Sequence, residues 1–267
     1  MRILSLNAWA GRIYPELLNY LIDVNPDVMC LQEVLRSRNT SAEWLLYRDD
    51  DVEFHQRANL FDDVRTAFPD HDAYFCSSMR GELLDGGTPV WVEFGLATLV
   101  RRSYSVIGQA MDFVHGEFSS DGWGPHPRPR NVHVMRLFNF DDSTATTIAN
   151  IHGLRGTDGK HDNPDRHIQA QALLDLIRRV WRPGEKLIVC GDFNVLPGSV
   201  TFEILGSAGL IDLVTAHGIT DTRTSHYRKP ERYADYILAT RDIEVIRFEA
   251  VESPEVSDHR ALLLEFE

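Results

Sequence analysis

The sequence has few cysteines and no long uninterrupted apolar run, and each absence excludes a class of protein. Its three cysteines, Cys30, Cys76 and Cys190, form no CxxC or Cys/His spacing of the kind that binds zinc. An odd number of cysteines without a disulfide framework favours a reducing compartment, and we expect these thiols to be buried. No apolar run approaches the roughly 18 residues that cross a membrane, and the chain opens on a strand pattern without the features of a signal peptide. We therefore expect a soluble, cytoplasmic protein without a transmembrane segment.

Positive charge is also scarce. The 267 residues include 27 Lys and Arg against 40 Asp and Glu, which gives a formal net charge of -13. Because non-specific DNA binding depends on Lys and Arg contacts to phosphates, this balance disfavours duplex DNA as a partner. A bound metal could still bring a phosphate into an acidic protein, since a bound cation is often the largest local charge in a site.

What the sequence does contain is an alternation of strand and helix patterns, which predicts one domain over residues 1–267. Apolar runs predict strands at 2–6, 27–31, 73–76, 90–101, 105–113, 132–140, 146–152, 186–190, 236–239, 244–248 and 261–266. Helical periodicity predicts helices over 13–24, 60–68 and 201–205, and a clearer one that begins at Asn163 as N-cap and Pro164 in the first turn. Strands dominate and many neighbours look antiparallel, so we expect an α/β (α+β) fold of two sheets packed face to face with helices outside. The segments 79–89 and 115–129 are rich in Gly, Pro and polar residues, and we expect functional loops there.

Polar side chains occur at the ends of several predicted strands, where the fold does not require them. They are Asn7, Glu33, His152, Asp192, Asn194, Asp258 and His259. Each one alone has a structural alternative: Asn7 a turn residue, Glu33 a charge at a helix entry, Asp192 part of a plain turn. Side chains at the ends of adjacent buried strands would converge on one rim of a sheet, so their joint occurrence favours a site.

The segments around these residues resemble the endonuclease/exonuclease/phosphatase family, which includes deoxyribonuclease I, abasic-site endonucleases, bacterial sphingomyelinases and inositol-polyphosphate 5-phosphatases. The matching segments are LNAW at 6–9, LQEV at 31–34, IHG at 151–153, GDFNVLPGS at 191–199, ADYIL at 234–238 and SDH at 257–259. They follow the family's order and span nearly the whole chain, and LQE, GDFN and SDH are specific in combination. The resemblance implies a four-layer sandwich of two packed, mixed, largely antiparallel sheets flanked by helices, with the active site at one end.

The resemblance also implies a metal site. Glu33 resembles the main metal ligand of the family, with Asn7 and Asp258 nearby. Oxygen donors of this kind suit Mg²⁺ or Mn²⁺ better than zinc. Such a metal would polarise a phosphoryl oxygen and offset charge in the transition state.

Further roles follow from the same resemblance. Asp192 resembles the residue that orients or deprotonates the attacking water, and Asn194 would help hold that water or the scissile phosphate. His259 would donate to a phosphate oxygen, with Asp235 fixing its tautomer and favouring the imidazolium. His152 resembles the second catalytic histidine of deoxyribonuclease I and the sphingomyelinases, and would protonate the leaving oxygen.

Other residues are predicted by position more than by motif, with surface charge as the alternative. Glu93 is expected to be the carboxylate partner of His152. Arg130 precedes a strand where the family often has a phosphate-binding Arg, so it joins Asn194 and His152 as a predicted substrate contact. Weaker candidates to line the site or touch substrate are Trp123, His126, Asp158, Lys160, Arg166 and His226.

These observations predict a Mg²⁺- or Mn²⁺-dependent phosphoester hydrolase, either a phosphodiesterase or a phosphomonoesterase, in which a metal- and Asp-activated water attacks phosphorus. An endo- or exonuclease acting on DNA or RNA is the alternative, and a catalytically silent binding protein on the same fold is a further one. The complete set of polar residues favours an enzyme. We expect a monomer with a small or single-ended phosphoester substrate, and the sequence leaves open whether that is a nucleic acid end, a phospholipid head group or a small organophosphate.

Overall fold

Two β-sheets stacked face to face form the centre of the protein in a computed structural model that describes residues 1–49, 52–156 and 159–267. The eight-stranded sheet contains β1 (Arg2–Asn7), β2 (Val28–Arg36), β3 (Trp44–Asp49), β4 (Val52–Arg57), β5 (His71–Asp85), β6 (Thr88–Arg101), β13 (Val245–Ala250) and β14 (Leu262–Phe266). The six-stranded sheet contains β7 (Tyr104–His115), β8 (Arg130–Asn139), β9 (Thr144–His152), β10 (Lys186–Asp192), β11 (Leu210–Asp212) and β12 (Asp235–Thr240). The helical elements are η1 (Trp9–Gly11), α1 (Glu16–Val24), α2 (Leu60–Ala67), α3 (Pro164–Val180), α4 (Val200–Gly206) and α5 (Leu213–Ala216).

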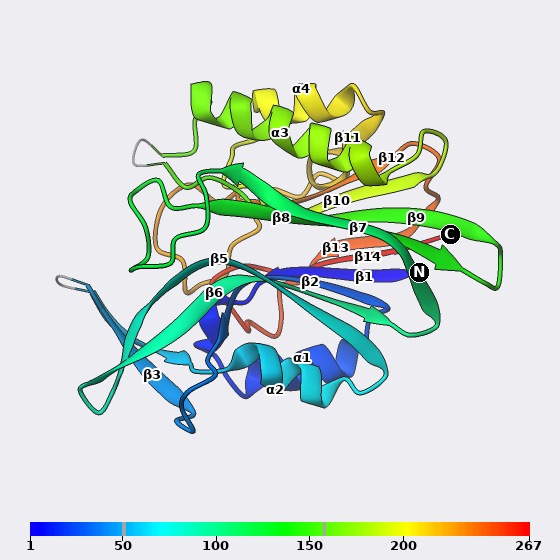
Figure 1. The fold of residues 1–267 in the computed structure, drawn as a ribbon. Helices are drawn as coiled ribbons and strands as arrows, with labels where there is room; N and C mark the ends of the chain where they lie inside the picture. The colour runs from blue at the N-terminus through cyan, green and yellow to red at the C-terminus, as the bar shows by residue number, and fades with distance from the viewer. Residues whose placement is uncertain (50–51, 157–158) are drawn as a thin grey trace.

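The helices cover the outer faces of the two sheets. In Figure 1, α1 and α2 lie against the eight-stranded sheet, and α3 and α4 lie against the six-stranded sheet on the other side of the molecule. The strand order is β13-β14-β1-β2-β6-β5-β3-β4 in the first sheet and β11-β12-β10-β9-β8-β7 in the second. The four layers and the mixed, mainly antiparallel pairing confirm the predicted fold class.

Strand direction brings the predicted site residues to one end of the sandwich. β1 runs parallel to β2, and β9 runs parallel to β10 with His152 opposite Asp192. β12 runs antiparallel to β10, so Asp235 at its start lies opposite Asp192 at the end of β10. The ends of β1, β2, β9 and β10 therefore meet the start of β12 at the left of Figure 1, which places Asn7 and Glu33 at the same end.

A buried polar network joins the two sheets behind that end. The Gln32 Nε2 donates to Asn150 Oδ1 at 2.8 Å, and the Asn150 Nδ2 donates to Thr98 Oγ1 at 3.2 Å. The His133 ring contacts Thr98 Oγ1 through Nδ1 at 3.1 Å and Gln109 Oε1 through Nε2 at 3.2 Å. Because hydrogen-bonded networks in a dry interior tolerate little displacement, this one fixes how the two sheets lie against each other.

The segment 79–89, predicted as an irregular loop, is instead a β-hairpin. β5 and β6 pair without interruption from Met79 opposite Phe94 to Asp85 opposite Thr88, and the two-residue turn is Gly86–Gly87 with φ angles of 54° and 95°. Two glycines suit a turn that requires positive φ at both central positions. Residues 116–129 do form an irregular segment, as predicted, and it touches β5 through a bridge between Met79 and Ser119.

Helix boundaries follow the predicted caps where the sequence contains them. Asn163 Oδ1 accepts a hydrogen bond from Arg166 N at 2.9 Å, with Pro164 at the first position of α3, as predicted. The three cysteines are buried free thiols, also as predicted. Among the described helices, none is both long and apolar enough to cross a membrane.

Candidate active site

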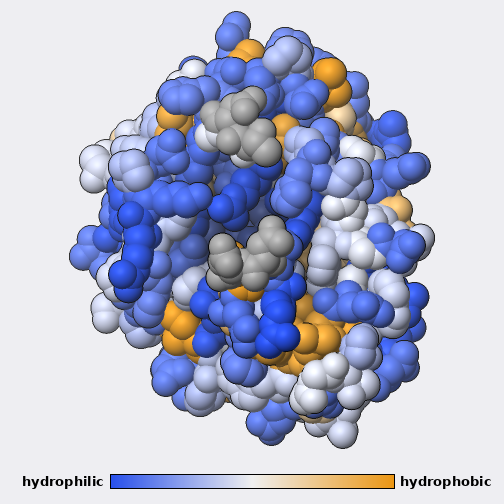
Figure 2. All heavy atoms as spheres, turned by 90° about the vertical axis from the view of Figure 1, so that its left-hand side faces the viewer, coloured by the Kyte–Doolittle hydropathy of each residue, from blue (hydrophilic) through white to orange (hydrophobic). Residues whose placement is uncertain are grey.

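The predicted polar residues gather at the end of the sandwich that faces the viewer in Figure 2, where the surface is hydrophilic and hollowed near its centre. Six of them are at most 4% exposed, namely Asn7, His152, Asp192, Asn194, Asp235 and His259. Burial of this many polar side chains is costly unless they are hydrogen-bonded or charge-paired. Their partners therefore define the site.

Asp192, at the end of β10, is the centre of this arrangement. Its Oδ2 accepts a hydrogen bond from Asn7 Nδ2 at 3.0 Å, which connects the two sheets. The same oxygen lies 3.8 Å from His152 Nε2 and 3.7 Å from His259 Nε2. Its Oδ1 accepts from the backbone N–H of Asn194 at 3.0 Å. One buried carboxylate oxygen thus faces two imidazoles and an amide.

Position 191, directly before Asp192, must be a glycine for steric reasons. A Cβ at this position would lie 1.9 Å from the Ile151 carbonyl oxygen, and φ is +143°. Only glycine permits β9 and β10 to approach so closely. Asn194 has φ of 54°, and its Nδ2 donates to the Gly153 carbonyl at 3.4 Å. The local sequence therefore sets the direction of the Asp192 side chain.

A β-bulge positions Glu33. The register of β2 against β6 shifts between Leu31 and Val34, and Glu33 within the bulge has φ of 54°. A non-glycine residue in this conformation costs about 1–3 kcal/mol, and bulges redirect side chains beside functional sites. The Glu33 Oε1 lies 3.8 Å from His152 Nε2. Burial, together with the charge of Asp192, raises the pKa of Glu33.

Asp235 holds His259 as predicted, but it does not make His259 an imidazolium in this arrangement. The His259 Nδ1 lies 2.7 Å from Asp235 Oδ2, while its Nε2 contacts Nη1 of Arg223. A guanidinium can only donate, so Nε2 presents its lone pair and the proton lies on Nδ1. Burial, and then the charge of Arg223, lowers the pKa of His259 to about 3. The positive charge expected on the imidazole is supplied by Arg223.

Arg223 is a site residue that the sequence analysis missed. It is 4% exposed, its Nη1 donates to Asp258 Oδ2 at 3.2 Å, and its guanidinium lies 4.1 Å from the centroid of the Tyr227 ring. A backbone bridge pairs it with His259. It follows no strand and belongs to no family segment noted in the sequence, so the only signal available was its place in the polar stretch before Asp235.

Arg130 lies close enough to Glu33 and Asp192 to interact with their charges, and its contact with substrate stays a prediction. Burial lowers its pKa to about 10, against the opposing charges of Glu33 and Asp192. Its Nε is buried without a hydrogen-bond partner among the described residues. A buried cation with an unpaired donor beside two carboxylates is suited to an oxyanion.

Lys160 and Arg166 also belong to this end of the molecule. The Lys160 ammonium donates to the Tyr233 carbonyl, and burial lowers its pKa to about 8. Arg166 is buried and donates to the carbonyl oxygens of Gly159 at 2.8 Å and Asn194 at 3.3 Å, so it braces the loops around Asp192. Asp158 lies outside the described residues.

The structure does not bring Glu93 to His152. Glu93 accepts hydrogen bonds from Arg36 at 2.9 and 3.0 Å, and Arg38 lies 3.5 Å away. The neighbouring Phe94 has its ring 6.4 Å from that of His152. Successive side chains of a strand point to opposite faces, so Glu93 points away when Phe94 points toward the site. The carboxylates near His152 are those of Glu33 and Asp192.

Burial, and then the charge of Arg130, lowers the pKa of His152 well below its ordinary value. This direction favours the neutral imidazole for His152 before substrate binds. In this form it can accept a proton or relay one, and donation to a leaving oxygen requires a proton acquired during the reaction.

Three further candidates lie around the rim. The Trp123 indole covers Gly81, where an added Cβ would lie 2.3 Å from the ring, and its centroid is 6.5 Å from that of Phe94. His226 lies 5.9 Å from the ring of Trp9, and His126 is exposed. Trp123 therefore lies beside Phe94, whose ring in turn lies 6.4 Å from that of His152.

The geometry permits a metal ion. Ligand atoms of Asp192, Asp235 and His259 lie within 4.8 Å of one another, and this group could hold a cation. His259 Nδ1 already contacts both carboxylate oxygens of Asp235, at 2.9 and 2.7 Å. Asp258 offers a different donor, because its Oδ1 is buried without a hydrogen-bond partner among the described residues.

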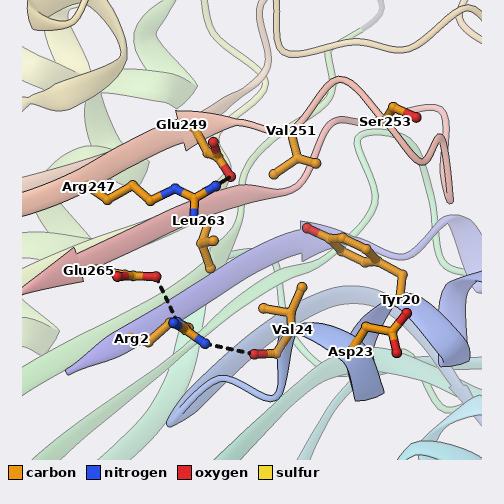
Figure 3. A pocket seen from close by; sticks show the side chains of 10 residues that line it. All are labelled: Arg2, Tyr20, Asp23, Val24, Arg247, Glu249, Val251, Ser253, Leu263 and Glu265. Carbon is orange, nitrogen blue, oxygen red and sulfur yellow. Dashed lines mark hydrogen bonds and ion pairs between the residues drawn. The ribbon is translucent and has the colours of Figure 1, made fainter.

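A cavity of about 310 Å³ lies on the eight-stranded sheet and α1, away from this site, and it contains none of the predicted site residues. Its charged side chains are already paired, Arg2 with Glu265 at 2.9 Å and Arg247 with Glu249 at 2.7 Å (Figure 3). Such pairs leave little net charge for a phosphate. This cavity is therefore a poor site for a phosphate.

Comparison with known proteins agrees with this arrangement. The model of the Endonuclease/Exonuclease/phosphatase family matches residues 4–259. The chain belongs to the endonuclease/exonuclease/phosphatase family. This confirms the resemblance found in the sequence, and members of the family are generally metal-dependent phosphoesterases. No curated protein matches the chain.

Solved structures of the family share the fold at low sequence identity. A Bacteroides vulgatus member has 18% identity and a TM-score of 0.69, with 100% of this chain and 98% of that chain covered. A mannosyl-6-phosphatase from Bacteroides thetaiotaomicron has 15% identity and a TM-score of 0.70, with 100% and 99% covered. The catalytic domain of human Nocturnin, with a bound sulfate anion, has 17% identity and a TM-score of 0.69, with 100% and 93% covered.

Proposed function

We propose that the protein is a Mg²⁺- or Mn²⁺-dependent phosphoester hydrolase in which Asp192 orients and deprotonates the attacking water. The observation that carries the proposal is the environment of Asp192 Oδ2, held by Asn7 at 3.0 Å with two imidazole nitrogens at 3.7 and 3.8 Å. A water or phosphoryl oxygen placed between these groups would contact a carboxylate base and two imidazole nitrogens at the same time.

The metal would be held by Glu33, Asn7 and Asp258. The buried Oδ1 of Asp258, which has no hydrogen-bond partner among the described residues, and the bulge that redirects Glu33 toward the site support this set. When bound, such a cation polarises a phosphoryl oxygen and offsets its developing charge. Hard oxygen donors favour Mg²⁺ or Mn²⁺ over softer metals.

The remaining residues would bind the phosphoryl group and manage the leaving oxygen. Arg223 and Arg130 supply buried positive charge, and His259, oriented by Asp235, accepts from Arg223 and so helps to position that guanidinium. His152 lies opposite, on β9, and would relay a proton to the leaving oxygen. Charge stabilisation at preorganised donors is usually the largest catalytic contribution in such sites.

Several facts favour a small or single-ended substrate over duplex DNA. Arg130, Lys160 and Arg223 are buried, whereas duplex binding requires exposed Lys and Arg along a track of phosphates. One structural relative is by name a mannosyl-6-phosphatase, and another contains a sulfate anion. Both are compatible with recognition of a single tetrahedral oxyanion. A nuclease acting on DNA or RNA ends remains the second candidate, because other members of the family cleave nucleic acids.

The test is a hydrolysis screen with Mg²⁺, Mn²⁺ or excess chelator against p-nitrophenyl phosphate, bis-p-nitrophenyl phosphate, oligonucleotides and sphingomyelin. We expect metal-dependent turnover that Asp192→Asn abolishes. Asp242→Asn is the matched control, since Asp242 is exposed beyond the far end of β12. Undiminished activity in chelator would contradict the metal role, and no activity on any substrate would favour the silent binding protein. Efficient nicking of supercoiled plasmid at moderate salt would instead support the nuclease.

A further inference from the structure

An arginine held between two aromatic rings lies beside the site and has no role in the steps above. The Cζ atom of Arg12 lies 3.9 Å from the centroid of the Trp9 ring and 4.2 Å from that of Phe54. Cation–π contact with two rings restricts the movement of the guanidinium. The N–H groups point outward from the edges of its plane, in the fork that matches a phosphate or carboxylate.

These N–H groups have no partner in the part of the chain that the structure describes. The side chain of Arg12 makes no hydrogen bond or ion pair there, and only its backbone N–H is bonded, to the Trp9 carbonyl at 3.2 Å. The carboxylates that influence it are those of Asp258 and Glu33, and Asp258 is already paired with Arg223. Arg12 is therefore a positioned cation with free donors.

A cavity of about 550 Å³ opens beside this arginine, and Arg12, Trp44 and His55 line it. Its connection to the active site is short. The 3-10 helix η1 follows Asn7 almost directly, and the Trp9 backbone N–H donates to Asn7 Oδ1 at 3.0 Å. Trp44 supplies an aromatic wall from β3. A substrate with its scissile phosphate at the site could therefore extend its leaving group toward Arg12.

We propose that Arg12 binds an oxyanion on the leaving group of the substrate, a second phosphate or a carboxylate separate from the scissile phosphoryl group. The substrate class is then a small organophosphate with a second negative group. This inference rests on the proposed hydrolase function. Arg12 is a specificity-determining residue, and Phe54 is a positioning residue that acts by keeping the guanidinium in its plane.

The kinetic test uses matched substrate pairs that differ by one anion: fructose 1,6-bisphosphate with fructose 6-phosphate, and 3-phosphoglycerate with glycerol 3-phosphate. The first pair tests a second phosphate and the second pair a carboxylate. We expect the wild type to prefer at least one doubly anionic member. The preference is measured as the kcat/KM of the doubly anionic member divided by that of the singly anionic member. Arg12→Gln should reduce this ratio by about 10- to 100-fold, mainly through KM, because a charge-assisted bidentate contact is lost.

Control variants separate this effect from general loss of charge or packing. Arg12→Lys keeps the charge but not the fork, and Phe54→Leu keeps an apolar contact but loses one π face, so each should reduce the ratio partly. Arg241→Gln removes an exposed arginine at the far end of β12 and should leave the ratio and the basal activity unchanged. Equal losses on both members of a pair in Arg12→Gln, or a wild-type ratio near one for both pairs, would overturn the proposal.

A binding measurement distinguishes this inference from the proposed function. Titration calorimetry in chelator, without turnover, compares 3-phosphoglycerate with glycerol 3-phosphate and fructose 1,6-bisphosphate with fructose 6-phosphate. Tighter binding of a doubly anionic member that Arg12→Gln removes would support the oxyanion site even if no substrate is hydrolysed. Turnover of p-nitrophenyl phosphate without any such discrimination in binding or kinetics would support the hydrolase and reject the role of Arg12.

Discussion

Replacing Arg223 by Gln should reduce both the stability and the activity of the protein, for different physical reasons. Mg²⁺ should restore part of the stability but not the activity. Arg223 is 4% exposed and donates to Asp258 Oδ2 at 3.2 Å. The other oxygen of Asp258 has no hydrogen-bond partner among the described residues, so the variant leaves a buried carboxylate without its cation. Removing one partner of a buried ion pair costs about 3–5 kcal/mol. For a domain of this size that corresponds to a fall in Tm of roughly 6–20 °C in chelator.

Mg²⁺ should restore part of that stability without restoring activity. Loss of Arg223 leaves both oxygens of Asp258 available to a cation, and a ligand at 100 times its Kd stabilises the folded state by about 2.7 kcal/mol. Mg²⁺ should therefore raise the Tm of the variant more than that of the wild type. The kcat/KM should stay lower by about 10²–10³-fold, because a preorganised donor to the phosphoryl group is missing.

The assay is thermal unfolding by circular dichroism in chelator and in Mg²⁺, together with hydrolysis of bis-p-nitrophenyl phosphate. Arg102→Gln is the matched control, because Arg102 pairs with Asp72 on the surface with both side chains more than half exposed. Exposed pairs contribute about 0–1 kcal/mol, so this variant should change little. The reasoning is refuted if Arg223→Gln and Arg102→Gln unfold alike, or if Mg²⁺ stabilises Arg223→Gln and the wild type equally.

Three further predictions concern the metal, the leaving group and pH. Glu33→Gln keeps the shape of the ligand but removes its charge, and should raise the Mg²⁺ concentration for half-maximal activity more than Asp258→Asn does; equal metal titrations would contradict this. His152→Ala should slow substrates with poor leaving groups by about 10²–10⁴-fold and good ones less, whereas His259→Ala should slow all of them; equal losses across a leaving-group series would reject the proton role of His152. Burial lowers the pKa of His133 to about 4, so the unfolded chain binds more protons below its ordinary pKa of about 6.5. Stability from His133 is complete above about pH 6.5 and falls by about 3 kcal/mol toward pH 4. Urea unfolding should show this loss in the wild type and not in His133→Gln, and parallel pH profiles would disprove it.

The residues at the rim of the active site could be predicted because the apolar runs of the sequence show where strands end. Asn7, His152 and Asp192 each follow an apolar run directly, and parallel pairing of their strands carries the side chains to one end. Glycine supplied a second signal, since Gly191 is required by the close approach of β9 and β10. Local chemistry and topology agree at these positions, which is why the motif could be interpreted without coordinates.

The partner of His152 could not be predicted, because it depends on which way one strand faces. Glu93 and Phe94 alternate across β6, and bulges in its pairing with β2 and β5 change the register beside them. A shift of one residue exchanges every side chain between the two faces of a strand. The sequence contains both residues but not the bulges, so position along the chain assigned Glu93 to a histidine that it does not approach.

The β3–β4 hairpin was missed for a related reason. Its strands contain many charged residues, and their burial is partial, so they lack the apolar alternation that identifies strands in a core. The hairpin nevertheless supplies Phe54 to the stack around Arg12 and Trp44 to the adjacent cavity. Residues that contact a ligand need not follow an apolar periodic pattern in the sequence. This part of the site could therefore be identified only from the structure.

The net charge of -13 gave little indication of the local charge at the site. Arg12, Arg130, Lys160 and Arg223 all lie around the carboxylates of the rim, and the Nε atoms of Arg130 and Arg223 are buried without hydrogen-bond partners among the described residues. Each of these cations carries a desolvation cost that its protein contacts repay only in part. An anionic ligand would supply the missing partners. Because Arg130, Lys160 and Arg223 are each at most 7% exposed, they suit one or two oxyanions of a small molecule better than the many phosphates of a duplex, and the plasmid-nicking assay tests this preference.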